Sequence, residues 1–527
     1  MSQCTEHTTD NHRGSLREVV AHCGPLRISG WHGLVLVVVL AAGLRLYGLG
    51  DRCFHGDEML SVTIAGSKTM AELQRVTRPA WHPPLHYGVP RLLYLAGAHT
   101  EAQWRIAGVL FGVILAAATF LIPLLWGAVR LSLPAGLLAA TSPMAVLFSQ
   151  SSRWHPLVAG ILALGCLSLV IAVKRDLIWA WLLAAVAFAL AFYTVFLAGV
   201  VATVLMLLAL YHTLRAGKPL TGWLSAAVLC LAAIVPLVRP AIFWSRPGQI
   251  LWEPVRSIFP VLGRSGLLLQ NLLVGPTVLP WNWAVMVPAT ILLAYLAWRF
   301  FASSEAQVCS LKGPAFAFFL LCLPVIVVAP VAASSRYWLI LLVPLHIGIA
   351  GGLLSISSRR LQLLGTAAIT ALVAYGLFNL YTHRQYQYRE LIDDWRGLAT
   401  MTRSLTQPGD EVWSVMSPFI YYYGSASLDV FEWYYDPAAV ARHVEHTNPS
   451  RIFLQYSPLS GWEVVNFARI GEIVGEELAA LGFTRQWCGY YGRDPDVAMK
   501  RKYLRGRTFP EYRHVVELWA RPAHRHR

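Results

Sequence analysis

The stretch WHGLVLVVVLAAGLRLYGL, residues 31–49, is followed after Gly50 by DRCFHGDE, residues 51–58. The first part is apolar over the length that a helix needs to cross a bilayer core, so the acid pair Asp57-Glu58 must lie at or just outside one membrane face. Acidic side chains at that depth are costly to keep unless they bind something or exchange protons. A second motif, His82-Pro83-Pro84-Leu85, follows in the same loop. Together the two motifs predict a functional face at the membrane surface.

The composition is that of a polytopic α-helical membrane protein. Of 527 residues, 56% are hydrophobic and 13% are charged, and the mean hydropathy is +0.51. Apolar runs of about 17–25 residues, long enough to span a bilayer, recur over roughly the first 380 positions. The run 178–212 is too long for one helix, so we place a break near Tyr193-Thr194; a single tilted span there would invert everything downstream. About eleven transmembrane helices are predicted, at residues 31–49, 103–126, 132–149, 157–173, 177–193, 195–212, 222–239, 283–300, 314–332, 337–354 and 361–380.

The distribution of lysine and arginine predicts the orientation of these spans. With the N-terminus inside, residues 1–30 form a cytoplasmic segment before an uncleaved anchor, and residues 31–380 form the transmembrane module. One outer loop is basic as well, with Arg239, Arg246 and Arg256. The net charge of +15 then reflects the inner loops and the C-terminal segment, so no nucleic-acid partner is expected. The basic residues of the inner loops are Arg130, Lys174, Arg175, Arg215, Lys218, Arg299, Lys312, Arg359 and Arg360.

Two regions outside the spans have predicted structure of their own. In the outer loop 50–102, segments 57–75 and 84–98 have apolar residues at helical spacing and are typical of helices that lie in the membrane interface. Residues 381–527, which we call the C-terminal segment, alternate helical patterns with short β-rich runs, which is typical of a small α/β domain. Because the N-terminus is predicted to be inside, an odd number of spans places the C-terminal segment on the outer side of the membrane. Its predicted elements are a helix capped by Asp393-Asp394 that runs to about Thr406, a helix over 462–481, and strands at 411–416, 451–456 and 515–520.

The cysteines do not have the spacing of metal ligands. On this topology only Cys53 and Cys488 face outward. We expect two unrelated thiols, and a disulfide between them in an oxidising compartment is the alternative.

Polar residues that stand out from the apolar background share one depth. They come from five separate stretches, yet all map to outer helix ends or outer loops. A transporter is expected to place ionisable residues near the midplane or in broken helices, whereas the middles of these spans are almost purely apolar. The contrast favours an enzyme at the outer face over a carrier. The residues are Asp57, Glu58, His82, Gln150, Arg153, His155, Tyr193 and Arg336.

The order of the motifs resembles the GT-C membrane glycosyltransferases, in particular the group of protein O-mannosyltransferases and lipid A aminoarabinose transferases. After the acid pair and the His-Pro-Pro-Leu motif come the stretches 149–156 (SQSSRWHP), 191–194 (AFYT), 335–337 (SRY) and 394–397 (DWRG). The resemblance implies a hexosyl- or pentosyltransferase of the inner (plasma) membrane. It would transfer a sugar, with inversion, from a polyprenyl-phosphate donor to a lipid, glycan or protein acceptor outside the cytoplasm.

The same resemblance assigns roles to the acid pair. It places the general base at Asp57, because an acceptor hydroxyl needs a carboxylate within hydrogen-bond reach. Glu58 would orient Asp57 or bind a divalent cation. The alternative is an acidic pair that complements a helix dipole. His82 would contact the acceptor or a carboxylate, or bind the cation, and a purely structural turn is its alternative.

Arg153 and Arg336 are the candidate phosphate ligands, since the planar guanidinium fits phosphate oxygens. The alternative for each is an arginine that extends from a helix end to the interface. Four further residues are candidates for the sugar site, with packing as their alternative: Gln150, His155, Tyr193 and Tyr337.

Two other functions stay open at this point. One is a flippase or transporter of a lipid-linked glycan. The other is a membrane scaffold whose C-terminal segment binds a partner.

Overall fold

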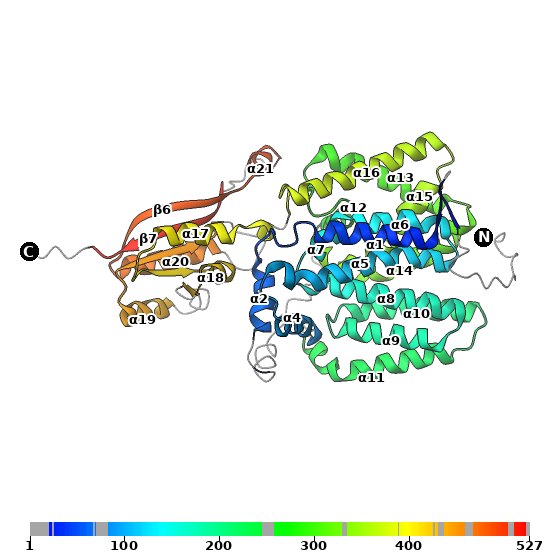
Figure 1. The fold of residues 1–527 in the computed structure, drawn as a ribbon, viewed down its shortest axis with the longest axis horizontal. Coiled ribbons are helices and arrows are strands. Elements are labelled where there is room, and N and C mark those ends of the chain that lie inside the picture. The colour runs from blue at the N-terminus through cyan, green and yellow to red at the C-terminus, as the bar shows by residue number, and fades with distance from the viewer. Residues whose placement is uncertain are drawn as a thin grey trace, which may run out of the picture.

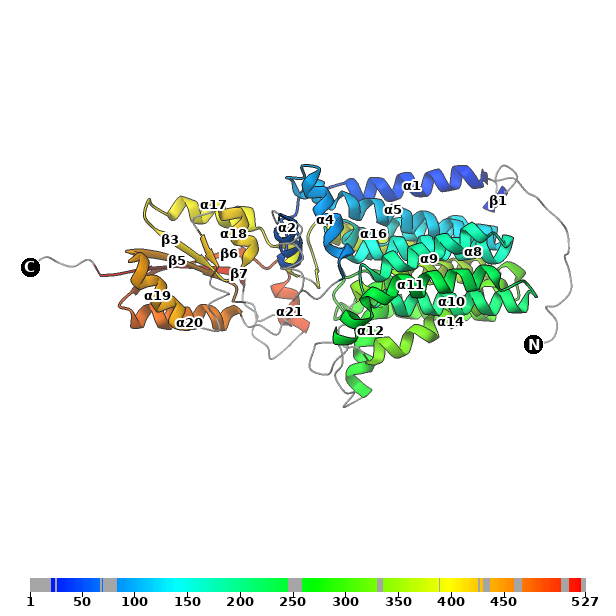
Figure 2. The same ribbon diagram turned by 90° about the horizontal axis from the view of Figure 1, so that it is seen from below.

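The computed structural model describes residues 20–23, 26–66, 69, 83–244, 258–328, 335–387, 389–424, 427–429, 437–458, 467–503 and 511–522. A helical bundle occupies one end of the molecule and a β-sheet with its own helices the other (Figure 1). Two short helices, α2 (Gly56–Ala65) and α4 (Leu85–Leu95), lie between them in both views (Figures 1 and 2).

The bundle is built from helices that run alongside one another (Figure 2). Its elements are α1 (Gly30–Leu46), α5 (Glu101–Trp126), α6 (Val129–Thr141), α7 (Pro143–Ser149), α8 (Trp154–Arg175), α9 (Ile178–Phe192), α10 (Ala198–Arg215), α11 (Thr221–Trp244), α12 (Ile258–Val274), α13 (Trp283–Ala302), α14 (Ala306–Val328), the 3₁₀ helix η2 (Ser335–Leu341), α15 (Leu342–Leu354) and α16 (Arg359–Tyr381).

Each of the eleven predicted spans coincides with a helix or with two consecutive ones. Among the described residues, seven helices are long and apolar enough to cross a membrane, and the bent pair α6 and α7, which meet at 52°, makes eight. Helices α1 and α9 are apolar but shorter. The predicted break is present, because α9 ends at Phe192 and α10 begins only at Ala198. The protein is therefore a multi-pass helical membrane protein, and the count of eleven spans stays a prediction.

Glycines allow some of the bundle helices to approach closely. A Cβ atom on Gly165 of α8 would lie 2.5 Å from the ring of Phe188 on α9. One on Gly352 of α15 would lie 2.3 Å from the carbonyl oxygen of Leu296 on α13. Small residues at such contacts let helices pack backbone to backbone in a membrane, where no hydrophobic effect drives them together. These close contacts fix the heights of the helix ends, and therefore the loops that join them.

The predicted interfacial helices are present but shorter than expected. The segment 57–75 contains α2, which ends at Ala65, and 84–98 contains α4. The remainder of the first segment lies mostly outside the described residues. A feature that the sequence did not predict is a hairpin before α1, in which β1 (Val20–Cys23) pairs antiparallel with β2 (Leu26–Ser29).

The C-terminal segment contains a five-stranded mixed sheet in the order β4-β3-β5-β7-β6. Strand β3 is parallel to β4 and β5, and β7 is antiparallel to both β5 and β6. The strands are β3 (Glu411–Ser414), β4 (Ser427–Asp429), β5 (Arg451–Tyr456), β6 (Thr484–Arg493) and β7 (Tyr512–Ala520). The helices are η3 (Arg389–Ile392), α17 (Trp395–Leu405), α18 (Ser417–Tyr423), α19 (Pro437–Thr447), α20 (Phe467–Ala480) and α21 (Val497–Tyr503).

The three predicted strands are confirmed as β3, β5 and β7, and β4 and β6 were missed. The predicted helix 462–481 contains α20, and its first residues lie outside the described part of the chain. Asp394 caps α17 as expected, because its Oδ1 accepts a hydrogen bond of 3.0 Å from the Gly397 amide. Cys53 and Cys488 are both free thiols, as expected.

Candidate active site

The acid pair lies in the first turn of α2. Asp57 and Glu58 complement the positive end of the helix dipole there. Glu58 also accepts a hydrogen bond of 3.4 Å from the His55 amide, which is half of a capping box. The helix dipole and the capping hydrogen bond explain why α2 begins at Gly56. The side chains of Asp57 and Glu58 point in different directions from this first turn.

Asp57 points to two arginines from distant parts of the chain. Its Oδ2 lies 3.4 Å from Arg336 Nη1 and 3.8 Å from Arg153 Nη2. Arg153 is almost fully buried and precedes α8, and its Nη1 also donates hydrogen bonds of 3.0 Å to the Asp57 carbonyl and to Ser61 Oγ. The Asp57 side chain is 41% exposed, so it is open to an incoming molecule. The structure thus brings together one accessible carboxylate and two guanidinium groups.

Glu58 points the other way and is buried against Arg105 of α5. Two parallel hydrogen bonds, of 3.0 and 2.8 Å, join the guanidinium to the two carboxylate oxygens. The Ser152 amide donates a third, of 2.7 Å, to Oε1. Burial by itself raises the pKa of Glu58, but the Arg105 charge and these hydrogen bonds outweigh it, so the pKa lies well below its usual range. Glu58 is therefore ionised, and both of its oxygens are engaged.

Arg105 also holds the loop before α2. It is 1% exposed, and its remaining N–H groups donate to the carbonyls of Leu49, Arg52 and Cys53 at 2.9–3.0 Å. The buried pair therefore fixes the loop 49–58 to the first turn of α5. The sequence reasoning did not single out Arg105. The signal was present, because an arginine inside a predicted span is rare and marks a site.

A divalent cation at Glu58 does not fit this arrangement. Both carboxylate oxygens accept from N–H donors, and the Arg105 charge lies against them. Burial lowers the pKa of His55 to about 4, so this neighbour is neutral near pH 7. The described residues hold no group of three His, Cys, Asp or Glu side chains with the geometry of a metal site. His82, the other residue considered for a cation, lies outside them.

An aromatic cluster adjoins the two arginines. The rings of Trp154 and His155, at the start of α8, are 5.0 and 5.7 Å from the ring of Tyr337, the neighbour of Arg336 in η2. The ring of His86, from α4, is 6.4 Å from Trp154. His155 and Tyr337, two of the candidate sugar-site residues, thus come from separate helices to one place. His155 is buried, while Tyr337 is half-buried.

Gln150 and Tyr193 have different surroundings. Gln150 is buried and donates to the carbonyls of Tyr47 and Arg45, while its Oε1 accepts from Arg52. Tyr193 donates its hydroxyl proton to the Ala233 carbonyl. Its own carbonyl accepts from the Leu85 amide. Gln150 therefore holds the end of α1, and Tyr193 anchors the first turn of α4.

The C-terminal segment contacts the same loop from the other side. The Tyr422 hydroxyl accepts from the Phe54 amide at 2.8 Å and donates to Glu101 Oε1 at 2.7 Å. Arg396 donates to the Asp51 carbonyl at 2.6 Å and to Cys53 Sγ at 3.3 Å. Cys53 packs in the same apolar cluster as helices α17 and α18. The residues just before the acid pair are therefore held between the bundle and the C-terminal segment.

The arrangement defines a class of protein, in which a membrane helical bundle presents an acid pair, on the short helix α2, beside a C-terminal α/β unit. No protein-family model and no curated protein matches the chain. Among solved structures it is similar to ArnT from Cupriavidus metallidurans bound to undecaprenyl phosphate, with a TM-score of 0.53 and 16% identity over 93% of this chain and 98% of that one. For ArnT in the apo state the TM-score is 0.51, with the same identity and coverage.

The archaeal oligosaccharyltransferase AglB from Archaeoglobus fulgidus is also similar, with a TM-score of 0.42 and 13% identity over 88% of this chain and 73% of that one. The ArnT structures carry the comparison, and at this identity they show the fold alone. The chain therefore has the fold of ArnT.

The buried Arg105–Glu58 pair gives a prediction of stability. Replacing Arg105 by Ala leaves an unpaired buried carboxylate, which costs about 3–5 kcal/mol, and it also leaves three loop carbonyls without their donor. Thermal unfolding of the purified protein should therefore begin at a clearly lower temperature. The matched control is Arg130→Ala, which breaks the exposed pair with Glu305 at 3.3 Å and costs at most about 1 kcal/mol. Equal shifts for the two variants would contradict the role given to Arg105.

Proposed function

We propose that the protein is an integral membrane glycosyltransferase of the inner (plasma) membrane. It transfers a sugar from a polyprenyl-phosphate donor to a hydroxyl group of a lipid, glycan or protein on the outer side, and Asp57 is the general base. The observation that carries the proposal is the convergence of the exposed Asp57 carboxylate with Arg153 and Arg336. The similarity in fold to a protein that was crystallised with undecaprenyl phosphate supports the donor class.

The two arginines suit a donor phosphate. A phosphate group at Asp57 Oδ2 would meet guanidinium groups from two sides, and charge-assisted hydrogen bonds of this kind are the strongest that a protein offers to phosphate. In the ligand-free protein Asp57 partners both arginines. On donor binding the phosphate becomes their anionic partner, which leaves the Asp57 carboxylate free to accept a proton.

The reaction follows from this exchange of partners. The acceptor hydroxyl gives its proton to Asp57, and its oxygen attacks the anomeric carbon of the sugar. The bond between that carbon and the phosphate oxygen breaks, and polyprenyl phosphate leaves with the electron pair. Arg153 and Arg336 stabilise the charge that develops on the leaving phosphate. A single displacement on the face opposite the phosphate inverts the anomeric configuration.

The remaining candidates take positions around this centre. Tyr337 and His155 form an aromatic wall beside Arg336 on which a sugar ring can pack. Glu58, held by Arg105, acts as a positioning residue because it fixes the first turn of α2 and with it Asp57. The C-terminal segment, proposed as an extracytoplasmic domain over residues 381–527, contacts the loop 50–54 and so lies on the acceptor side of the site.

The test of the base is Asp57→Asn. Turnover should fall by about two to four powers of ten, since proton transfer to a positioned carboxylate is lost, whereas binding of the polyprenyl-phosphate donor should be unchanged. Donor binding and single-turnover transfer are measured on the purified protein. Asp51→Asn, an exposed acid of the same loop, is the matched control. Transfer by Asp57→Asn within a few-fold of the unmodified protein would overturn the assignment and favour the flippase or scaffold alternatives.

The test of the phosphate site is Arg336→Ala. Donor affinity should fall by about 1.5–3 kcal/mol, the range of a lost hydrogen bond to a charged group. Arg153→Ala should do the same with an added loss of stability, because Arg153 also bonds Ser61 and the Asp57 carbonyl. Arg384→Ala, an exposed arginine just after α16, is the control. If a phosphate-free polyprenol loses affinity equally, the effect is structural and not due to phosphate binding.

The side of the membrane is tested by reporter fusions. A fusion at Arg527 should be active only with an extracytoplasmic reporter such as alkaline phosphatase, because about eleven spans place the C-terminus opposite an inside N-terminus. A fusion after Arg360 should report the inside. A cytoplasmic signal at Arg527 would show that a span was miscounted, and the outer placement of Arg336 would fail with it.

A further inference from the structure

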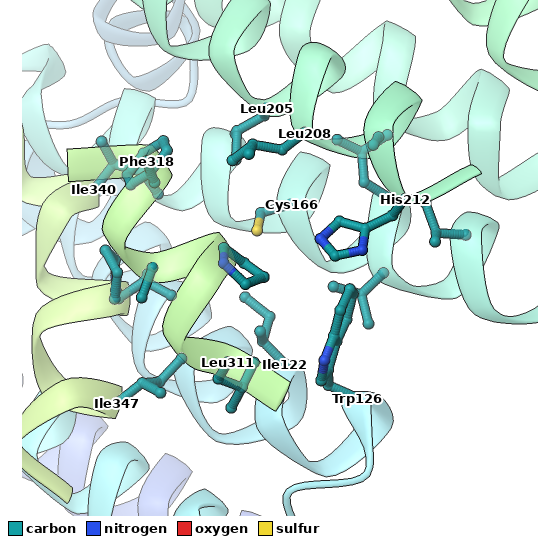
Figure 3. A pocket seen from close by; sticks show the side chains of 18 residues that line it. Ile122, Trp126, Cys166, Leu205, Leu208, His212, Leu311, Phe318, Ile340 and Ile347 are labelled. Carbon is teal, nitrogen blue, oxygen red and sulfur yellow. The ribbon is translucent and has the colours of Figure 1, made fainter. Parts of the chain in front are cut away.

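A second candidate binding site lies at the end of the bundle opposite Asp57. Helix α5 begins at Glu101, next to the loop of the acid pair, and its 26 residues carry it about 39 Å to Trp126. Trp126 lines a cavity of about 120 Å³ between α5, α8, α10, α14, η2 and α15. Figure 3 shows the side chains that surround it. The Trp126 end of this cavity is therefore far from Asp57, while Ile340 of η2, four residues after Arg336, lines its other end.

The lining of the cavity is almost entirely apolar. Typical lining residues are Leu205, Phe318 and Ile347. Apart from the Cys166 thiol, the side chains of the lining that carry polar atoms are those of His212 and Trp126, which lie at one end of the cavity (Figure 3). An apolar cavity of this size stays dry and binds an apolar guest. Trp126 and His212 are only half-buried, so the cavity reaches the surface of the bundle at this end. A hydrocarbon chain is the guest that such a lining fits.

Basic side chains surround that end of the cavity. The Lys174 ammonium lies 4.6 Å from the centre of the Trp126 ring, and the His212 ring lies 5.1 Å from it. Lys218 donates to the carbonyls of Val173, another lining residue, and Lys174. Arg215 follows one turn after His212. A row of cations from α8, α10 and the loop after α10 thus borders an apolar cavity.

These charges are not neutralised within the described part of the chain. The acid nearest in sequence is Asp176, and Glu305, just before α14, pairs with Arg130. Neither Lys174 nor Lys218 forms an ion pair among the described residues. An excess of basic residues on inner loops is general for membrane proteins. Here the excess is combined with an apolar cavity beside it, and basic pockets between transmembrane helices bind the head groups of anionic lipids.

We infer that this cavity binds a segment of one acyl chain of an anionic phospholipid, whose head group lies against Lys174, Lys218 and His212. The inference does not rest on the proposed transferase function. It requires only that the bundle is in a membrane with these basic residues at a lipid surface. The occupant is a resident membrane lipid and not the donor, because its head-group contacts are the basic residues at the Trp126 end of the cavity, whereas Arg336 lies one turn before Ile340 at the opposite end.

The test uses the full-length protein, purified in a neutral detergent and incubated with equal amounts of phosphatidylglycerol and phosphatidylcholine. Native mass spectrometry should find phosphatidylglycerol retained about thirtyfold more often, as expected for head-group contact with two basic side chains that each add about fivefold. Lys174→Ala/Lys218→Ala should lower its retention by about tenfold and leave that of phosphatidylcholine unchanged. The matched control is Arg359→Ala/Arg360→Ala, an exposed basic pair at the start of α16 that does not line the cavity.

Filling the cavity provides an independent measurement. Ala209→Phe places a ring among the lining residues and should abolish retention of phosphatidylglycerol while the elution volume and melting temperature stay near those of the unmodified protein. If the buried position 209 does not tolerate Phe, the variant Ala315→Phe is used in its place, because Ala315 of α14 also lines the cavity and is only half-buried. Equal retention of the two phospholipids, or no effect of the lysine substitutions, would overturn the inference. Displacement of phosphatidylglycerol by an equal amount of undecaprenyl phosphate would also overturn it and assign the cavity to the carrier lipid.

Discussion

The buried ion pair between Arg105 and Glu58 is the constraint on which the structure around Asp57 depends. Burying two charges costs several kcal/mol per ion, and only a geometry that satisfies every donor and acceptor offsets that cost. Here each carboxylate oxygen accepts two hydrogen bonds, and the guanidinium also binds three loop carbonyls. The pair adds little net stability compared with an apolar pair of equal volume, but it allows one arrangement of the loop and excludes others.

The division of labour within the acid pair follows from that geometry. Two adjacent residues in the first turn of a helix point about 100° apart, so one carboxylate faces the bundle and the other faces the opening of the site. Glu58 is inaccessible and permanently charged, while Asp57 is exposed and faces two arginines. A proton acceptor must exchange with solvent or substrate, and a structural anchor must not. Neighbouring carboxylates meet both requirements because the rotation of about 100° between them places the two side chains in different environments.

Much of this architecture could be predicted from the sequence because hydrophobic length is a strong signal in membranes. The spans and the break after Phe192 were found from it, and so was the common depth of Asp57, Arg153 and Arg336. Arg105 was missed, because it lies inside an apolar run where its partner, 47 positions earlier, is not evident from spacing. Strand β6 was missed because its burial follows no regular alternation, and β4 because three residues are too few to show a period. The roles of Gln150 and Tyr193 depend on which backbone groups lie near them, and composition carries no information on that.

The contacts of Tyr422 and Arg396 with residues 51–54 have a consequence for how such proteins diversify. The C-terminal segment is covalently distant from the loop, yet its hydroxyl and guanidinium groups complete the hydrogen bonding of that loop, and Cys53 of the loop fills a gap in the segment's own core. The loop and the C-terminal segment therefore pack as one structural unit. A C-terminal segment exchanged between two relatives would keep these contacts only if residues 51–54 were exchanged with it, so a chimaera joined near residue 381 alone would lose them.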